Sequence, residues 1–295
     1  MSVRNGVFKI LSDLGVASCE QREVLSTSTR DRANLTVYRD RASGVIYIDD
    51  FYSGDEIYEE GAYRKSNLNL FGTRDYEVLT DANRRASAYQ QYVVGRDVLD
   101  FGCGDGAFLY KIRDSVQSCC GVELQRDYIT ALKSRGINCH SSTDELPTDL
   151  VDTAVSFHVI EHLPDPLTAL GELFRVLKSE GIVVVEVPHA NDLLLNRLQN
   201  NAFRDFTLWS QHLVLHTRES LRRLLVAAGF ESVLVEGVQR YSLSNHLSWL
   251  VNGLPGGHKS PLSALDTPAL REAYQAALNK IDATDTLVAV GRKPT

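Results

Sequence analysis

The sequence predicts an α/β fold, in which an open and mainly parallel β-sheet carries helices on both faces. Short apolar runs alternate with helix-like segments after residue 96, and this order builds β-α-β units. The runs are almost continuously apolar, as expected of strands that are covered on both faces. A glycine-rich loop follows the first of these strands, and ligands of such sheets bind beyond the carboxyl ends of the strands.

The composition is that of an ordinary globular protein. Its 295 residues are 43% hydrophobic and 23% charged, and the net charge of -7 argues against general binding to nucleic-acid phosphates. Charged side chains interrupt the first thirty residues, so we expect neither a signal peptide nor a membrane span there. Five cysteines without a CxxC pair indicate reduced thiols. We therefore expect a cytoplasmic protein.

Residues 1–79 are predicted to form an N-terminal accessory region beside the binding site. Apolar residues alternate from Val37 to Asp49 around the sequence Ala-Ser-Gly, which predicts a β-hairpin. Aromatic residues crowd the stretch that follows, and this pattern fits either a lid over a ligand or the packing of a small subdomain. These aromatic residues are Tyr47, Phe51, Tyr52, Tyr58 and Tyr63.

Residues 80–295 are predicted to form the core domain. A helix over Thr80 to Val94 precedes its first strand, and residues 239–284 separate its last two strands as a cap insertion with a helix over Pro268 to Ile281. The strands are expected at Asp97 to Phe101, Ser118 to Glu123, Ile137 to His140, Val151 to Phe157, Ile182 to Val187, Ser232 to Val238 and Thr286 to Gly291. The remaining helices are expected at Arg126 to Arg135, Pro166 to Leu177 and Glu219 to Gly229.

The loop after the first core strand is typical of a cofactor-binding loop. In VLDFGCGDGAF, Asp100 lies near the end of the strand, and Gly102, Gly104 and Gly106 precede a helix. Glycines allow positive φ and close approach of a ligand, while the helix N-terminus presents N–H groups to a carboxylate or phosphate. The loop also satisfies the dinucleotide pattern GxGxxG/A, with Glu123 placed like its ribose-binding acid, so a nicotinamide enzyme stays open.

This loop resembles the first motif, (V/L)LDxGCGxG, of class I methyltransferases that use S-adenosylmethionine. The resemblance implies a Rossmann-like sheet of seven strands with a reversed final strand, and S-adenosylhomocysteine as a product. It also implies that the loop holds the methionine portion, that Glu123 binds the ribose hydroxyls and that residues 142–144 border the adenine. The cofactor-binding residues expected on this basis are Asp100, Phe101, Gly102, Cys103, Gly104, Gly106, Phe108, Glu123, Leu124, Ser142 and His158.

A second candidate cluster follows the fourth core strand. The sequence HVIEHLPDP spaces His158, Glu161 and His162 so that one helical turn would bring them to a common face. His212 and His216 precede a later helix and are expected to converge on the same crevice. Over about residues 98–230, these segments resemble methyltransferases of sugar and surface-polysaccharide biosynthesis. That resemblance implies a small-molecule acceptor, namely a hydroxyl of a sugar or of a nucleotide-linked sugar.

The same cluster resembles the ExxEH segment and later histidine that bind a divalent ion in ubiquinone-pathway and small-RNA 2′-O-methyltransferases. Here His158 replaces the first glutamate, and imidazole favours Zn, Ni or Fe over Mg²⁺. His158, Glu161, His162 and His212 are therefore candidates either for a metal site or for metal-free catalysis, in which a base takes the proton of the attacking hydroxyl. Carbon methylation of a keto-sugar, RNA 2′-O-methylation, an NAD-dependent oxidoreductase and a non-catalytic cofactor-binding module stay open as alternatives.

Other side chains are weaker candidates. His189 follows the fifth core strand and is a candidate for the site, whereas Arg84 and Arg85 are expected on a solvated helix face. An acceptor pocket could also be lined by Trp209, His246, Trp249, Gly256, Gly257 and His258.

Overall fold

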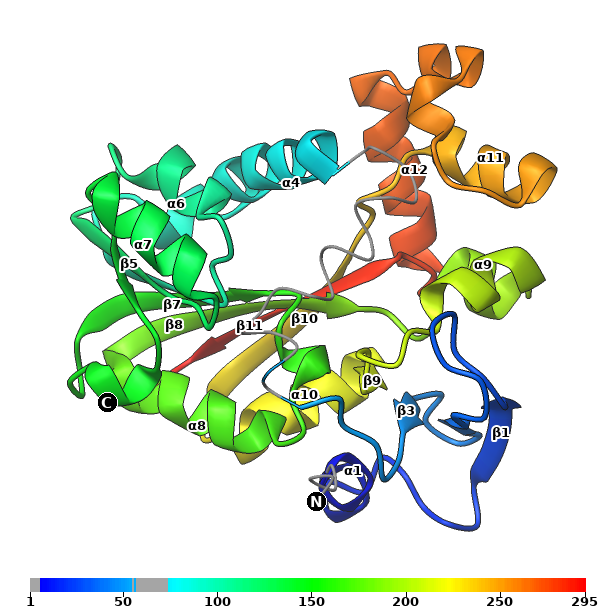
Figure 1. Ribbon diagram of the computed structural model, residues 1–295, viewed down its shortest axis with the longest axis horizontal. Helices are drawn as coiled ribbons and strands as arrows, with labels where there is room; N and C mark the ends of the chain where they lie inside the picture. The colour runs from blue at the N-terminus through cyan, green and yellow to red at the C-terminus, as the bar shows by residue number, and fades with distance from the viewer. Residues whose placement is uncertain (1–5, 55, 57–73) are drawn as a thin grey trace.

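A seven-stranded β-sheet forms the centre of the molecule (Figure 1) in the computed structural model, which describes residues 6–54, 56 and 74–295. The strand order is β10-β11-β8-β7-β4-β5-β6. β11 runs antiparallel to both of its neighbours, and β4 to β8 are mutually parallel. The predicted sheet with its reversed final strand is confirmed. Its strands are β4 (Asp97–Phe101), β5 (Ser118–Val122), β6 (Asn138–His140), β7 (Val151–Phe157), β8 (Leu177–Pro188), β10 (Glu231–Val238) and β11 (Thr286–Arg292).

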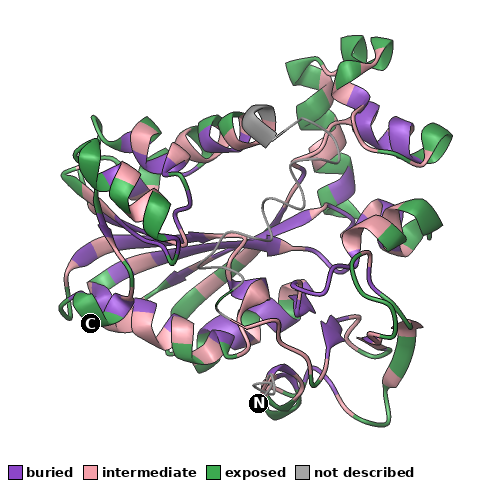
Figure 2. Ribbon diagram, in the orientation of Figure 1, coloured by how far each residue is buried: buried purple, intermediate pink, exposed green. Residues whose placement is uncertain are grey.

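Helices cover both faces of this sheet and make one apolar core on each. Val183 and Val185 of β8 pack into the core beneath α8 and α10, and Val184 between them packs into the core beneath α5, α6 and α7. Alternate residues therefore serve opposite faces, and the strands are buried along most of their length (Figure 2). The helices are α4 (Arg74–Ala88), α5 (Gln90–Val93), α6 (Ala107–Ile112), α7 (Arg126–Ser134), α8 (Pro166–Val176) and α10 (Arg218–Ala227).

The two helices on the α8 face have local start and stop signals. The Asp165 carboxylate accepts a hydrogen bond from the backbone N–H of Thr168 at 3.0 Å, and Pro166 occupies the first turn of α8. Thr217 and Ser220 form a capping box at the start of α10. Gly229 follows α10 with φ +100°, which closes the helix as expected.

A second, smaller sheet lies beside the central one and has the order β1-β2-β3-β9. The predicted hairpin is confirmed, because Val37 of β2 pairs with Ile48 of β3. Tyr47 is fully buried within the hairpin, whereas Tyr58 and Tyr63 lie outside the described residues. The sheet's last strand comes from far along the chain and pairs with β3. The elements of this part are α1 (Val7–Asp13), β1 (Arg22–Ser26), β2 (Val37–Asp40), β3 (Ile46–Ile48) and β9 (Val214–Leu215).

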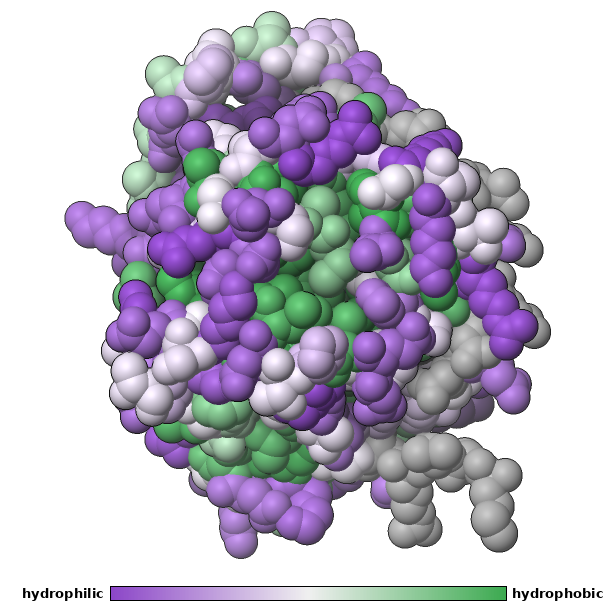
Figure 3. All heavy atoms as spheres, turned by 90° about the vertical axis from the view of Figure 1, so that its left-hand side faces the viewer, coloured by the Kyte–Doolittle hydropathy of each residue, from purple (hydrophilic) through white to green (hydrophobic). Residues whose placement is uncertain are grey.

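Two further helical groups stand at the carboxyl end of the sheet. One follows β8 and the other connects β10 to β11 (Figure 1). No helix in the described part of the chain is long and apolar enough to cross a bilayer. The side of the molecule at the left of Figure 1, where α6 and α7 lie, exposes apolar side chains between polar ones (Figure 3). The helical elements are η3 (Leu193–Arg197), α9 (Asn201–Thr207), α11 (Leu243–Asn252), η4 (Gly257–Lys259), η5 (Pro261–Leu265) and α12 (Pro268–Lys280).

Candidate active site

A cavity of about 1160 Å³ lies at the carboxyl ends of the central strands. Phe101, Val122, Phe157 and Pro188 line it, and each is the last residue of its strand. Residues of the N-terminal region and of the segment between β10 and β11 also line it. The segment that follows β8 lines it as well. We call the wall formed by the glycine loop the donor half. We call the wall formed by the N-terminal region, the segment after β8 and the segment between β10 and β11 the acceptor half.

The glycine loop forms the donor half. Gly102 has φ +77°, and a Cβ on it would lie 2.4 Å from a methyl of Val159, so this position accepts only glycine without strain. Of the predicted cofactor residues, all except Gly106 line the cavity. Gly106 immediately precedes α6, and a Cβ there would lie 2.3 Å from Leu132 of α7. Its role in this structure is therefore to let the loop pack against α7.

Glu123 lies at the end of β5 and holds the glycine loop in place. Its carboxylate accepts backbone N–H bonds from Gly104 at 2.8 Å, Leu124 at 2.9 Å and Gln125 at 3.0 Å. The side chain is buried, yet it lines the cavity. The backbone donors thus fix a carboxylate beside the space in which a ligand would lie.

Asp100 supplies a second buried carboxyl group to the donor half. Burial raises its pKa to about 7, although the positive charge of Arg85 lowers it and the negative charge of Glu123 raises it further. A cation that bound beside Asp100 would favour its ionised form. The donor half is therefore suited to a ligand that carries a positive group.

Glu161, His162 and His212 form a compact cluster on the cavity wall. Their ligating atoms all lie within 4.8 Å of one another. Glu161 and His162 belong to the short turn η2 (Ile160–His162), and His212 precedes β9. Glu161 is fully buried, and burial raises its pKa to about 8. The expected convergence of His212 with these two residues is present.

The expected helical turn that would bring His158, Glu161 and His162 to a common face is not present, and His158 is not among the clustered ligating atoms. It has φ +56° and lies outside η2. Its Nε2 lies 3.0 Å from an Arg240 N–H and its Nδ1 lies 3.1 Å from Glu161 Oε1. Arginine can only donate, so His158 Nε2 accepts and Nδ1–H donates to Glu161. His158 therefore orients the carboxylate of Glu161, and both of its nitrogens are engaged.

His216 also departs from the expectation, because it does not line the cavity. It is buried, with Nδ1 3.0 Å from the hydroxyl of Ser220. His189, by contrast, lines the cavity, and its Nδ1–H donates to the carbonyl of Thr284 at 2.9 Å. The two histidines are joined through a backbone bridge.

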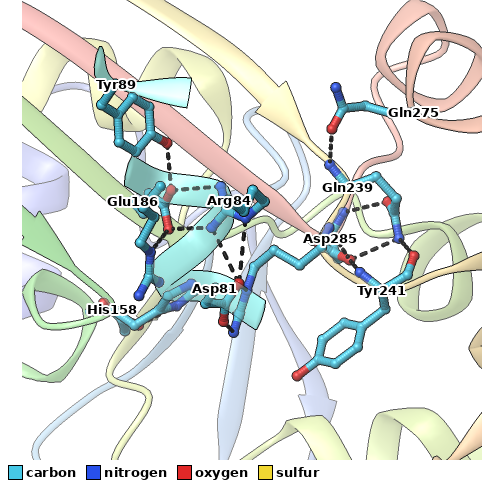
Figure 4. Close-up of polar contacts among 12 residues, drawn as sticks. Asp81, Arg84, Tyr89, His158, Glu186, Gln239, Tyr241, Gln275 and Asp285 are labelled. Carbon is cyan, nitrogen blue, oxygen red and sulfur yellow. Dashed lines mark hydrogen bonds and ion pairs between the residues drawn. The ribbon is translucent and has the colours of Figure 1, made fainter. Parts of the chain in front are cut away.

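Arg84 and Arg85 do not lie on a solvated helix face, so that prediction was wrong. Arg84 donates two hydrogen bonds of 2.9 Å to the carboxylate of Glu186, and Arg85 donates one of 2.8 Å (Figure 4). The Tyr89 hydroxyl also donates to Glu186, which is fully buried in β8. This buried ion cluster fixes α4 to the sheet and thereby positions one wall of the cavity.

A second polar network, which the sequence did not predict, centres on Arg240. The guanidinium forms an ion pair with Asp81 of α4 and donates to His158. Nearby, Asp285 accepts from the Gln239 amide at 2.7 Å and from the Tyr241 N–H at 2.9 Å (Figure 4). Gln239, Arg240 and Tyr241 follow β10, and Asp285 precedes β11. Only their position next to a strand end could have indicated a role.

Several aromatic side chains line the acceptor half. The ring of Phe206 lies 5.1 Å from that of Trp249, and the Arg30 guanidinium lies 4.4 Å above the ring of Trp209. Tyr52 lines the same wall. Of the predicted pocket residues, Trp209, His246, Trp249 and Gly256 line the cavity, whereas Gly257 and His258 do not.

The fold and the donor half together define a class I methyltransferase domain, whose methyl donor is S-adenosylmethionine. This chain belongs to the methyltransferase domain family, because the model of that family matches residues 71–235, more than half of the chain. A nicotinamide enzyme is thereby set aside.

Individual relatives agree with this membership. A protein of Mycolicibacterium smegmatis, named a probable S-adenosylmethionine-dependent methyltransferase, is 34% identical over 182 residues, which cover 56% of this chain and 66% of that protein. The chain thus spans just under two thirds of the length of this curated relative.

Two solved structures share the fold at low sequence identity. A SAM dependent methyltransferase from Archaeoglobus fulgidus has a TM-score of 0.50 at 21% identity, covering 71% of this chain and 92% of that one. A chain from the complex of the Haloferax volcanii Trm112 methyltransferase activator with a methyltransferase has a TM-score of 0.53 at 17% identity, covering 83% and 99%. Both likenesses concern the fold alone.

Proposed function

We propose that this protein transfers the methyl group of S-adenosylmethionine to a hydroxyl oxygen of an uncharged small molecule, with a sugar as the favoured acceptor. One observation carries the proposal. The glycine loop with Glu123 and the cluster of Glu161, His162 and His212 line the same cavity. A donor and an acceptor held in that cavity would meet without crossing open solvent.

On the donor side, each part of the cofactor has a matching group. Asp100 offers a buried carboxyl to the ammonium of the methionine portion, and the glycine loop offers backbone without Cβ atoms, along which that portion can lie closely. Glu123 accepts hydrogen bonds from the ribose hydroxyls, and Ser142 lies beside the adenine. His158 also lines the cavity, and it contacts Arg240.

The charge of the cavity favours an acceptor without phosphate groups. Among the described lining residues the cations are Arg30, Arg85 and Arg240, and carboxylates outnumber them. Arg85 is paired with Glu186, and Arg240 is paired with Asp81. Aromatic walls such as those of the acceptor half can stack on the apolar faces of a sugar ring. A free sugar or glycoside therefore fits better than a nucleotide-linked sugar or an RNA.

The reaction joins the acceptor oxygen to the methyl carbon while the bond between that carbon and the sulfur breaks. The sulfur keeps the electron pair of the broken bond, which leaves S-adenosylhomocysteine, and the acceptor loses its hydroxyl proton. Holding the oxygen in line with the methyl group and the sulfur supplies much of the acceleration. The Glu161, His162 and His212 cluster promotes the loss of the proton, which contributes roughly 10²- to 10⁴-fold in comparable systems.

The proposal is tested with purified protein, methyl-labelled S-adenosylmethionine and a panel of acceptors. The panel contains methyl glycosides, nucleotide-linked sugars, keto-sugars and a short RNA. We expect label on a sugar hydroxyl, located by mass spectrometry of the product. His212→Ala should abolish this transfer, whereas Glu219→Gln on the outer surface of α10 should not alter it.

Three results would overturn the proposal. Label on a carbon of the keto-sugar would indicate carbon methylation, and label on the RNA would indicate a 2′-O-methyltransferase. Binding of S-adenosylhomocysteine without transfer to any member of the panel would favour a non-catalytic cofactor-binding module.

A further inference from the structure

The cluster on the cavity wall has the donor types and the support of a metal site. Glu161 contributes a carboxylate, and His162 and His212 contribute imidazoles, with their ligating atoms within 4.8 Å of one another. All three side chains line the cavity. Two imidazoles and one carboxylate are a common ligand set for a divalent ion that keeps an open position for a substrate or water.

The hydrogen bonds of the two histidines fix which nitrogen faces the cluster. His162 Nδ1 lies 2.8 Å from the Gln211 carbonyl, and His212 Nδ1 lies 3.3 Å from the Thr207 carbonyl. A carbonyl can only accept, so each Nδ1 carries the proton and each Nε2 carries a lone pair. Metal-binding histidines are characteristically oriented by this kind of second hydrogen bond.

Packing holds the rings at this spacing. The ring centroids of His162 and His212 are 5.1 Å apart, and the indole of Trp209 meets both rings edge to face at 5.8 Å and 5.3 Å. Glu161 Oε1 lies 3.8 Å from His162 Nε2. If these side chains moved modestly toward one another, an ion among them would lie at the roughly 2.0–2.2 Å from each ligand atom at which nitrogen and oxygen bind zinc.

Glu161 provides an independent indication of a missing ligand. Its side chain is fully buried, and its Oε2 has no hydrogen-bond partner among the described residues. A buried carboxylate oxygen without a partner is costly, so native proteins rarely keep one. An ion at the cluster would satisfy this atom.

We propose that Glu161, His162 and His212 bind one divalent ion of the zinc, iron or cobalt class, with its open coordination positions facing the acceptor half. His158 is not a ligand, because Glu161 and Arg240 occupy its two nitrogens. It orients Glu161 instead. The proposed ligand set is thus smaller than the four residues that the sequence suggested.

The ion's role in catalysis rests on the proposed function, whereas ion binding does not. An acceptor hydroxyl bound to the ion becomes more acidic, since a divalent cation stabilises the resulting oxyanion. Its proton passes to water in the cavity, and the oxygen then takes the methyl group while the sulfur keeps the electron pair. The ion is neither oxidised nor reduced.

The test uses the full chain without an affinity tag, because a histidine tag would itself bind metal. The chain is stripped with a chelator and titrated with Co²⁺, whose visible absorption reports imidazole coordination, and with Zn²⁺ in a calorimeter. We expect one ion per chain. His162→Ala and His212→Ala should each weaken binding by roughly 100-fold or more, and His158→Gln by roughly 10-fold, as expected of a supporting residue.

His140→Gln serves as the matched control, because His140 lies on β6 and contacts Glu145 rather than the cluster. It should bind the ion as the unmodified chain does. Binding of S-adenosylhomocysteine by each variant reports that the chain is folded and that the donor half is intact, so failure of the metal site is distinguished from failure of the proposed function.

Two results would overturn the metal site. The first is an absence of Co²⁺ and Zn²⁺ binding at millimolar concentration, and the second is equal affinity in His162→Ala, His212→Ala and the unmodified chain. Full turnover by the chelated chain, with loss of turnover in His212→Ala, would instead assign proton removal to the histidine itself.

Discussion

Replacement of Glu186 by glutamine tests whether the buried ion cluster holds α4 on the sheet. Glu186 is fully buried and accepts three hydrogen bonds from Arg84 and Arg85 and a fourth from Tyr89. Glutamine keeps the size of the side chain but removes its charge and replaces one acceptor oxygen by a donor. Two guanidiniums would then lie beside the sheet without their shared anion.

The expected loss of stability is large. Removing one partner of a buried ion pair costs about 3–5 kcal/mol, because the remaining charge stays buried. At roughly 2–4 °C per kcal/mol for a domain of this size, the Tm of Glu186→Gln should fall by roughly 6–20 °C. Thermal unfolding followed by circular dichroism measures this change. Glu180→Gln is the matched control, because Glu180 is an exposed residue of the same strand.

The loss should also depend on pH. Burial by itself would raise the pKa of Glu186, but the charges of Arg85 and Arg84 hold it well below its usual value. A carboxyl whose pKa is lowered on folding stabilises the protein above the unfolded pKa of about 4.5, and this stabilisation is lost as the pH falls. The difference between the unmodified chain and Glu186→Gln should therefore narrow between pH 5 and pH 3. A change below about 1 kcal/mol at pH 7, or a difference independent of pH, would refute the reasoning.

Three further predictions concern the donor half and the buried core. Glu123→Gln should weaken binding of S-adenosylhomocysteine by roughly 10- to 100-fold, because a charge-assisted hydrogen bond is lost; calorimetry checks this against Glu219→Gln, and equal affinities would contradict it. Gly102→Ala should cost about 2–4 kcal/mol through its positive φ and its contact with Val159, and adding Val159→Ala should restore only part of that loss in thermal unfolding. Burial lowers the pKa of His216 to about 3, so its neutral form stabilises the fold above the unfolded pKa of about 6.5 and the chain loses on the order of 2 kcal/mol as the pH falls to 5. Denaturant unfolding above pH 6.5 and at pH 5 should show a smaller loss of stability for His216→Gln than for the unmodified chain. Equal losses in the two chains would rule out this contribution of His216.

The parts of the molecule that the sequence predicted are those with local signals. The strands were predictable because their apolar runs are long enough to be covered on both faces, as in residues 182–187 of β8. The glycine loop was predictable because backbone geometry requires glycine at positions such as Gly102. The end of α10 was predictable because Gly229, which takes a positive φ, follows its apolar pattern.

The remaining features depend on partners that are distant along the chain. Arg84 has the spacing of a surface residue, and its partner Glu186 comes 102 residues later. His158 matches a ligand pattern, but Arg240, 82 residues later, occupies one of its nitrogens. No periodicity or motif encodes such pairings. The cluster with His212 was foreseen because His162 follows a strand end and His212 comes shortly before a later helix.

The pairing of β3 with β9 means that the accessory sheet cannot be treated as an interchangeable module. Ile46 lies opposite Leu215, and Asp31 accepts hydrogen bonds from the backbone N–H and the hydroxyl of Ser210. His212 lies between these two attachment points. Grafting the first fifty residues of a relative onto this chain would therefore disturb the histidine that we place in the site. A working chimera would have to exchange residues 208–216 together with the N-terminal segment.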